Sequence, residues 1–121
     1  MKVNARPCIA YAAWRTISGK ESSGIFDCSQ SKHISMTGSV TPTHLDITDQ
    51  ERCCRFSGEG NASRYSLYDS DRHHVTLNIK GDCFVGHDYE SSSGFSGKVQ
   101  GNVLNLYDCE SGLSFVFRLE G

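Results

Sequence analysis

Carboxylates recur along this chain at a nearly constant interval, and they are the side chains best able to do chemistry. Five aspartates stand 22, 20, 19 and 20 residues apart, each near the end of a short apolar stretch. They are Asp27, Asp49, Asp69, Asp88 and Asp108, and four of them are followed two residues later by a second acid, Glu51, Asp71, Glu90 or Glu110. A beat of about twenty residues indicates one supersecondary unit copied several times, which would bring these acids to one end of the fold.

Such a ring of acids has three interpretations. It could bind a divalent cation through oxygens, as calcium prefers, or place paired carboxylates for acid–base catalysis, where crowding raises one pKa. Alternatively, each aspartate accepts a hydrogen bond from the backbone two residues on and closes its own turn. We expect the third, because catalytic sites are asymmetric and these acids follow the repeat. No metal-ligand set and no cofactor is indicated, since zinc-ribbon, phosphate-loop and dinucleotide motifs are absent from the sequence.

Exposed aromatic residues are expected beside the acids. Tyr68 and Tyr107 each precede an aspartate and take the outward phase of their segments, and together with Phe26 they could form a strip. Strips of this kind bind sugars, bases or protein partners, whereas cross-strand packing is the alternative. The predicted ligand or partner rim comprises Tyr68, Asp69, Asp88, Tyr89, Tyr107, Asp108 and Glu110.

The histidines offer weaker signals. His73 and His74 should face opposite sides of one strand, so they cannot hold one metal together. His87 stands next to Asp88 and could act as a general base, or it could simply be a surface histidine near a strand end.

The elements that must position these residues are strands. Segments such as Val75–Ile79 alternate apolar and polar residues, which is typical of a sheet with one buried face. Turns containing Gly, Asn or Asp fall between the aspartate turns and suit hairpins. Strands are predicted near residues 8–17, 24–27, 33–40, 44–48, 53–58, 63–68, 73–80, 83–88, 94–100, 103–107 and 113–119. The first is ambiguous, because its alanines would also tolerate a helix.

These strands predict one all-β domain spanning residues 1–121. An up-and-down antiparallel meander of hairpin repeats must bury one face and protect two edges, and a barrel closed on itself does both. We therefore predict a closed or nearly closed barrel of about 8–10 strands, with a two-layer β-roll or sandwich as the alternative. Large inward residues such as Phe56, Leu77 and Phe117 favour an interior filled by side chains.

A resemblance supports the β fold. Gly94–Leu119 contains Phe95-Ser96-Gly97-Lys98-Val99 and Leu106-Tyr107-Asp108-Cys109-Glu110-Ser111-Gly112 before a closing aromatic strand. This half of the chain resembles small uncharacterised bacterial β proteins that repeat a Tyr-Asp-aromatic-Glu-x-Gly turn, some of them carried on mobile gene cassettes. Here Cys28 and Cys109 replace the aromatic residue after Asp. The resemblance implies a β fold and transfers no activity and no site residues.

Composition narrows the possible partners. The net charge is −2 and the twelve basic residues are dispersed, which argues against nucleic acid as a partner. No stretch has the roughly twenty apolar residues of a membrane helix, and the N-terminus lacks the pattern of a signal peptide. We therefore expect a cytoplasmic protein whose six cysteines are mostly free thiols.

The sequence favours a non-enzymatic β-barrel binding or interaction module that uses the acidic, aromatic rim. Its partner would be an unknown protein or small molecule. One alternative is an enzyme with a small acid–base site at the barrel mouth, using Asp108, Asp69 or His87. Another is a structural protein whose edge strands pair between subunits, and a homodimer is possible.

Overall fold

Ten antiparallel strands form a closed barrel in the computed structural model, which describes residues 5–50, 54–61, 63–69 and 71–120. Each strand pairs with the next along the chain, and the first pairs with the last through Ile25 opposite Leu119. The strands are β1 (Gly24–Asp27), β2 (Lys32–Val40), β3 (His44–Asp49), β4 (Cys54–Gly60), β5 (Arg64–Tyr68), β6 (His74–Lys80), β7 (Cys83–Asp88), β8 (Ser93–Gln100), β9 (Val103–Asp108) and β10 (Leu113–Glu120). The prediction of a closed up-and-down barrel is confirmed. Glu51 lies outside the described residues.

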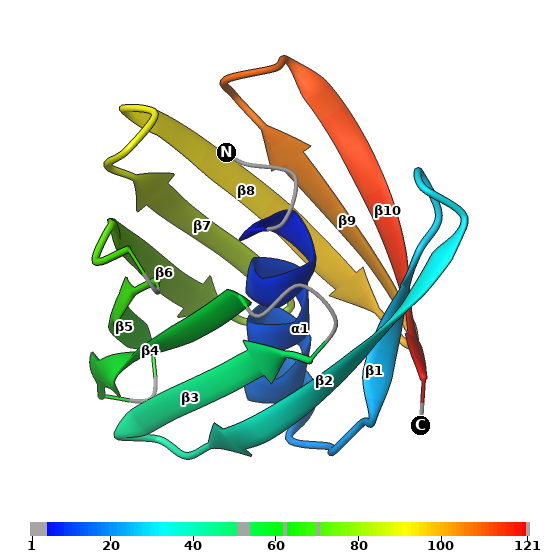
Figure 1. Ribbon diagram of the computed structural model, residues 1–121, viewed down its shortest axis with the longest axis horizontal. Coiled ribbons are helices and arrows are strands. Elements are labelled where there is room, and N and C mark those ends of the chain that lie inside the picture. Colours follow the sequence, from blue (N-terminus) through cyan, green and yellow to red (C-terminus); the bar gives the residue numbers. More distant parts are fainter. Residues whose placement is uncertain (1–4, 51–53, 62, 70, 121) are drawn as a thin grey trace.

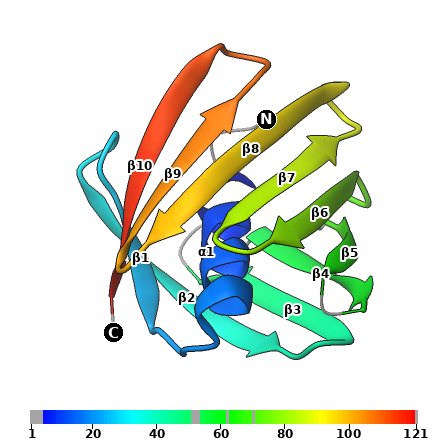
Figure 2. The same cartoon turned by 180° about the vertical axis from the view of Figure 1, so that it is seen from behind.

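The first predicted strand is wrong. Residues 8–17 belong to α1 (Ala5–Ser18), a helix that the strands enclose in both ribbon views (Figures 1 and 2). Every residue from Pro7 to Trp14 is buried, so all sides of this part of the helix are covered. The barrel interior is therefore filled by a helix as well as by side chains, which corrects the expectation of side chains alone.

Barrel size explains why a helix is present. Eight strands enclose a space that side chains can fill, and the enclosed width grows with each added strand. Ten strands leave room at the axis, and α1 fills it with small residues such as Ala10 and Ala12 and larger ones such as Tyr11, all of them buried. A helix that is apolar on all sides is stable only when it is buried on all sides.

Local sequence also defines the ends of α1. Pro7 lies in the first turn, where no intrahelical N–H partner is required. Gly19 follows the helix with a φ of 68° and its N–H donates to the Arg15 carbonyl at 3.0 Å, a glycine-capped end.

The strands bury alternate residues as their pattern predicts. In β6, Val75 and Leu77 are buried, and β3 and β9 alternate in the same way. Because odd-numbered strands all run in one direction, the aspartate turns lie together at one end of the barrel, here called the aspartate end. The turns that join each even-numbered strand to the next strand lie at the opposite end. No helix among the described residues is long and apolar enough to cross a membrane.

Candidate functional site

Four of the repeated aspartates are buried, and three of these four accept hydrogen bonds from their own turns. Asp27, Asp49, Asp88 and Asp108 are at most 6% exposed. Oδ1 of Asp88 accepts the Glu90 N–H and Oδ1 of Asp108 accepts the Glu110 N–H, both at 3.1 Å. Asp27 and Asp69 make the same bond, from Ser29 at 3.0 Å and from Asp71 at 2.9 Å. These aspartates therefore close their own turns, as the third interpretation expects.

The second carboxylate oxygen meets a different group in each of these turns. Oδ2 of Asp27 accepts from Gln30 at 2.8 Å, and Oδ2 of Asp88 accepts from the Ser91 hydroxyl at 3.1 Å. Oδ2 of Asp108 accepts from Arg6 of α1 at 3.3 Å, and that guanidinium also lies 4.0 Å over the Phe115 ring. Oδ2 of Asp69 lies 3.1 Å from Nδ1 of His73. Only the last of these four turns places an imidazole beside the carboxylate.

A second acid completes a small cluster around His73. Oε2 of Glu90, from the turn between β7 and β8, lies 2.6 Å from the same Nδ1. One donor atom from each of Asp69, His73 and Glu90 lies within 4.8 Å of the others. Two neighbouring hairpins thus contribute to one group, here called the Asp–His–Glu cluster.

Backbone bonds hold the two hairpins in this position. The Tyr89 N–H donates to the His74 carbonyl at 3.0 Å, which carries the β6–β7 ladder one residue further at the aspartate end. Within the turn between β5 and β6, the Asp69 N–H donates to the His73 carbonyl at 3.1 Å. The His73 N–H donates to Asp69 Oδ1 at 2.8 Å. The cluster is therefore built on hydrogen-bonded backbone at both contributing turns.

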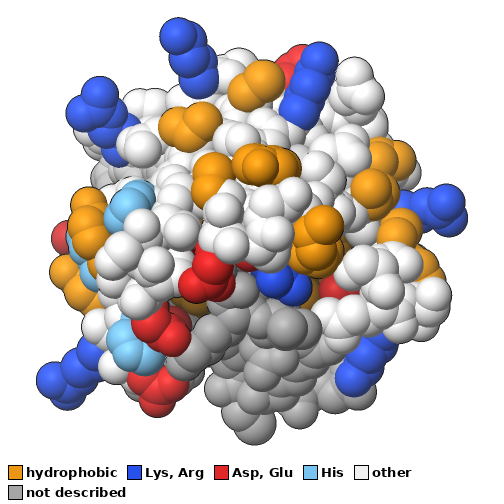
Figure 3. All heavy atoms as spheres, turned by 90° about the horizontal axis from the view of Figure 1, so that it is seen from above, with side chains coloured by type: hydrophobic (Ala, Val, Ile, Leu, Met, Phe, Trp, Pro, Cys, Tyr) orange, Lys and Arg blue, Asp and Glu red, His pale blue; other side chains and the backbone are white. Residues whose placement is uncertain are grey.

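A row of stacked rings lies beside the cluster on the outer face of the barrel. His74 stacks on Tyr68 with centroids 4.9 Å apart and on Tyr89 with centroids 4.8 Å apart, and His87 meets Tyr89 edge-on at 4.5 Å. We call these four residues the aromatic row. In Figure 3, which views the molecule from above Figure 1, acidic and histidine side chains lie beside hydrophobic ones along the left side.

The predicted rim residues separate into three groups. Tyr68, Asp69 and Tyr89 come together through His73 and His74. Asp88 and Asp108 are buried in their turns. Tyr107 and Glu110 are exposed at the turn between β9 and β10. The predicted strip of Tyr68, Tyr107 and Phe26 is not continuous, because three strands separate β5 from β9 and from β1, and one strand separates β9 from β1.

His73, His74 and His87 were not predicted as rim members, and Glu90 was predicted in the ring of acids but not in the ligand rim. The alternation at His73 and His74 correctly places them on different sides, one facing the acids and the other stacked between tyrosines. The side chains of His87 and Asp88 also point to different sides. The His87 ring contacts Tyr89, whereas the Asp88 carboxylate accepts a hydrogen bond from the backbone of its own turn. No signal in the sequence indicated that Glu90 would reach a histidine of another hairpin.

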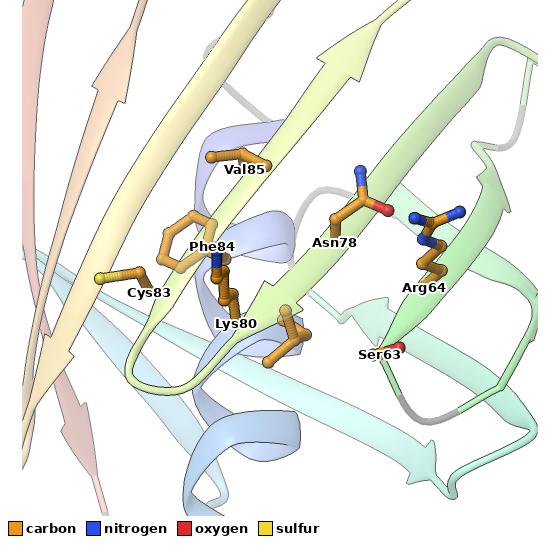
Figure 4. Close-up of a pocket in the computed structure, with 8 residues that line it drawn as sticks. Ser63, Arg64, Asn78, Lys80, Cys83, Phe84 and Val85 are labelled. Carbon is orange, nitrogen blue, oxygen red and sulfur yellow. The ribbon is translucent and has the colours of Figure 1, made fainter.

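A separate groove of about 600 Å³ lies outside β5, β6 and β7, toward the opposite end of the barrel. Figure 4 shows Arg64 and Asn78 side by side on neighbouring strands, with Lys80, Cys83 and Val85 along the rest of the groove. The groove is open, carries two cationic side chains and includes none of the predicted rim residues.

Comparisons with protein-family models, with curated proteins and with solved structures found no match for this chain. What the protein does must therefore be inferred from its own residues and their geometry.

Proposed function

We propose that this protein is a non-enzymatic binding module that uses the aspartate end of its barrel to meet a protein partner. One observation carries the proposal. Of five large hydrophobic side chains exposed on the described surface, four lie at the aspartate end, Tyr68, Tyr89, Tyr107 and Leu113, with exposed fractions of 44–57%. Tyr68 and Tyr89 lie together across the His74 ring, whereas Tyr107 and Leu113 lie on the neighbouring strands β9 and β10. Exposed apolar groups gathered in this way are typical of interaction sites.

Stacking prepares this surface for binding. Tyrosines are enriched at the centres of protein interfaces because they bury a large area and have few rotatable bonds. Tyr68 and Tyr89 are already restrained by the His74 ring between them, so little side-chain freedom remains to be lost on association.

Exposed charges beside the tyrosines indicate the chemistry of the partner. Asp71 and Glu110 are exposed acids, and Arg72 is an exposed base in the same turn as Asp71. A partner with charges of both signs beside apolar residues would complement the aspartate end.

The proposal includes a cytoplasmic location and an origin by duplication. Exposed Cys83 and Cys109 are free thiols, which suits a reducing compartment. Duplication is supported by the recurrence of Gly38 and Ile47 as Gly97 and Leu106, since each glycine lies opposite its apolar counterpart in the ladder.

Selection from a displayed library of random short peptides tests the binding proposal. We expect enriched peptides to carry aromatic and charged residues. Their affinity should fall about tenfold or more for Tyr68→Ser/Tyr89→Ser, because the central aromatic contacts are lost. It should also fall as salt rises.

Val85→Ser is the matched control, because Val85 is 52% exposed but lies in the middle of β7. Selected peptides should bind this variant as they bind the wild type. Peptides that bind the double variant with undiminished affinity, or a selection that enriches nothing, would contradict the proposal.

A further inference from the structure

We propose that Asp69, His73 and Glu90 form a binding site for one divalent transition-metal ion of the Zn²⁺ type. This site does not depend on a protein partner, and its occupancy can be measured on the purified chain alone.

The donor set suits such an ion. It offers one imidazole nitrogen and two carboxylate oxygens, the ligands that zinc and its first-row neighbours share in proteins. Calcium is a poorer fit, because it prefers six to eight oxygen ligands, whereas one of these three donors is nitrogen.

Charge gives a second reason. Two carboxylate oxygens approach the same Nδ1 at 2.6 and 3.1 Å, so two anionic groups converge on one potential ligand nitrogen. A neutral imidazole with two carboxylates has two negative charges, which one divalent ion neutralises. The side chains of Asp69 and Glu90 are only 15% and 29% exposed, so water screens these charges incompletely.

The geometry requires a small adjustment. Donors about 2.0–2.2 Å from a tetrahedral ion lie roughly 3.3–3.6 Å apart. The Asp69–His73 separation of 3.1 Å is close to this value, whereas the 2.6 Å between His73 and Glu90 must lengthen. Glu90 is the donor able to move, because it is a long side chain on a partly exposed turn.

The turn between β5 and β6 orients the other two donors. Oδ1 of Asp69 accepts the backbone N–H groups of Asp71 and His73, which leaves Oδ2 directed at the imidazole. With Nδ1 as the ligand, the ring proton resides on Nε2. Three protein ligands leave a fourth position for water or for a group from a partner.

The experiment measures Zn²⁺ binding by calorimetry and by native mass spectrometry after chelator treatment. It uses a Cys83→Ser/Cys109→Ser background, because exposed thiols also bind zinc. We expect one ion per chain, a higher melting temperature with Zn²⁺, and a shift of the His73 side-chain nitrogen resonances. His73→Gln and Glu90→Gln should each weaken binding about tenfold or more.

Two matched controls separate the site from general surface binding. Glu110 follows Asp108 as Glu90 follows Asp88, and His44 is an exposed histidine at the opposite end of the barrel. Glu110→Gln and His44→Gln should bind Zn²⁺ as the background protein does. Loss of binding in these controls, no measurable Zn²⁺ binding, or a Co²⁺ spectrum with thiolate charge-transfer bands that persist in His73→Gln would overturn the assignment.

Discussion

The hydroxyl groups of two buried tyrosines hold backbone segments that lie between helix and strand or between two strands. The Tyr11 hydroxyl of α1 donates to the Ser22 carbonyl, and the Tyr65 hydroxyl of β5 donates to the Thr41 carbonyl at 2.8 Å. Burial raises the pKa of Tyr11 above its ordinary value of 10.0, although the nearby Arg15 charge opposes the rise. Burial also raises the pKa of Tyr65.

This shift predicts alkaline destabilisation. A folded-state pKa above the unfolded value favours folding fully below pH 10.0, and the contribution is lost as pH rises through the folded value. Urea unfolding from pH 7 upward should show stability falling above about pH 10. Tyr11→Phe should lose about 1 kcal/mol at pH 7, because a hydrogen bond is removed, but decline less steeply at high pH.

Tyr107→Phe provides the comparison, because Tyr107 is 44% exposed on the barrel surface. It should follow the wild-type curve at every pH. If the stability of Tyr11→Phe falls as steeply above about pH 10 as that of the wild type, groups other than Tyr11 cause the alkaline loss.

The role of the aspartates in closing their own turns could be predicted from the sequence, whereas the Asp–His–Glu cluster could not. An Asp side chain reaches its own turn, so the pattern around Asp88 and Asp108 is local. His73 and Glu90 are seventeen positions apart in different hairpins. Their contact depends on the pairing of β6 with β7, which the composition of either turn does not specify.

At the scale of the elements, the backbones of β4 and β5 approach each other closely at a glycine. A Cβ on Gly58 of β4 would lie 1.9 Å from the Ser66 carbonyl oxygen of β5, and this is a backbone atom that cannot rotate away. Gly58 therefore allows the two strands to curl tightly at this point.

Gly58→Ala should destabilise the protein by about 1–3 kcal/mol in chemical denaturation, because the sheet must open to accept the methyl group. Gly94→Ala is the control. Its added Cβ would lie 3.4 Å from the Gly86 carbonyl oxygen, an ordinary contact, so stability should change little. Equal losses in both variants would point to a general effect of replacing strand glycines.

The helix shows where element prediction failed. Ala10, Ala12 and Ala13 favour a helix, and Pro7 and Gly19 mark its ends, yet a segment apolar on all sides lacks the 3.6-residue periodicity by which surface helices are identified. A helix inside a barrel is covered on all sides, so its sequence does not need a polar face and shows no such periodicity.

At the scale of the whole molecule, α1 and the barrel stabilise one another. Trp14 is 3% exposed, and its indole N–H donates to the Gly101 carbonyl at 3.2 Å, while Arg15 donates to the Gly38 carbonyl at 2.9 Å. Arg6 ties the other end of α1 to Asp108. The helix thus contacts the barrel at both ends and along its length.

We therefore expect one cooperative unfolding transition. Trp14 is the single tryptophan, so its fluorescence reports on α1, whereas far-UV circular dichroism reports mainly on the ten strands. The two signals should change at the same urea concentration, because neither part has a complete core alone. A fluorescence change at lower urea would show instead that α1 leaves the barrel as a separate unit.

Strand positions, turn chemistry and the gathering of aspartates at one end could be predicted because each depends on residues near one another in sequence. Period-two alternation marks a half-buried strand wherever it occurs, and an up-and-down order follows from short turns. The occupant of the barrel and the neighbours of Tyr89 and His73 could not be predicted in this way. They depend on how many strands close the barrel and which hairpins then stand side by side, and this closure is a property of the complete chain.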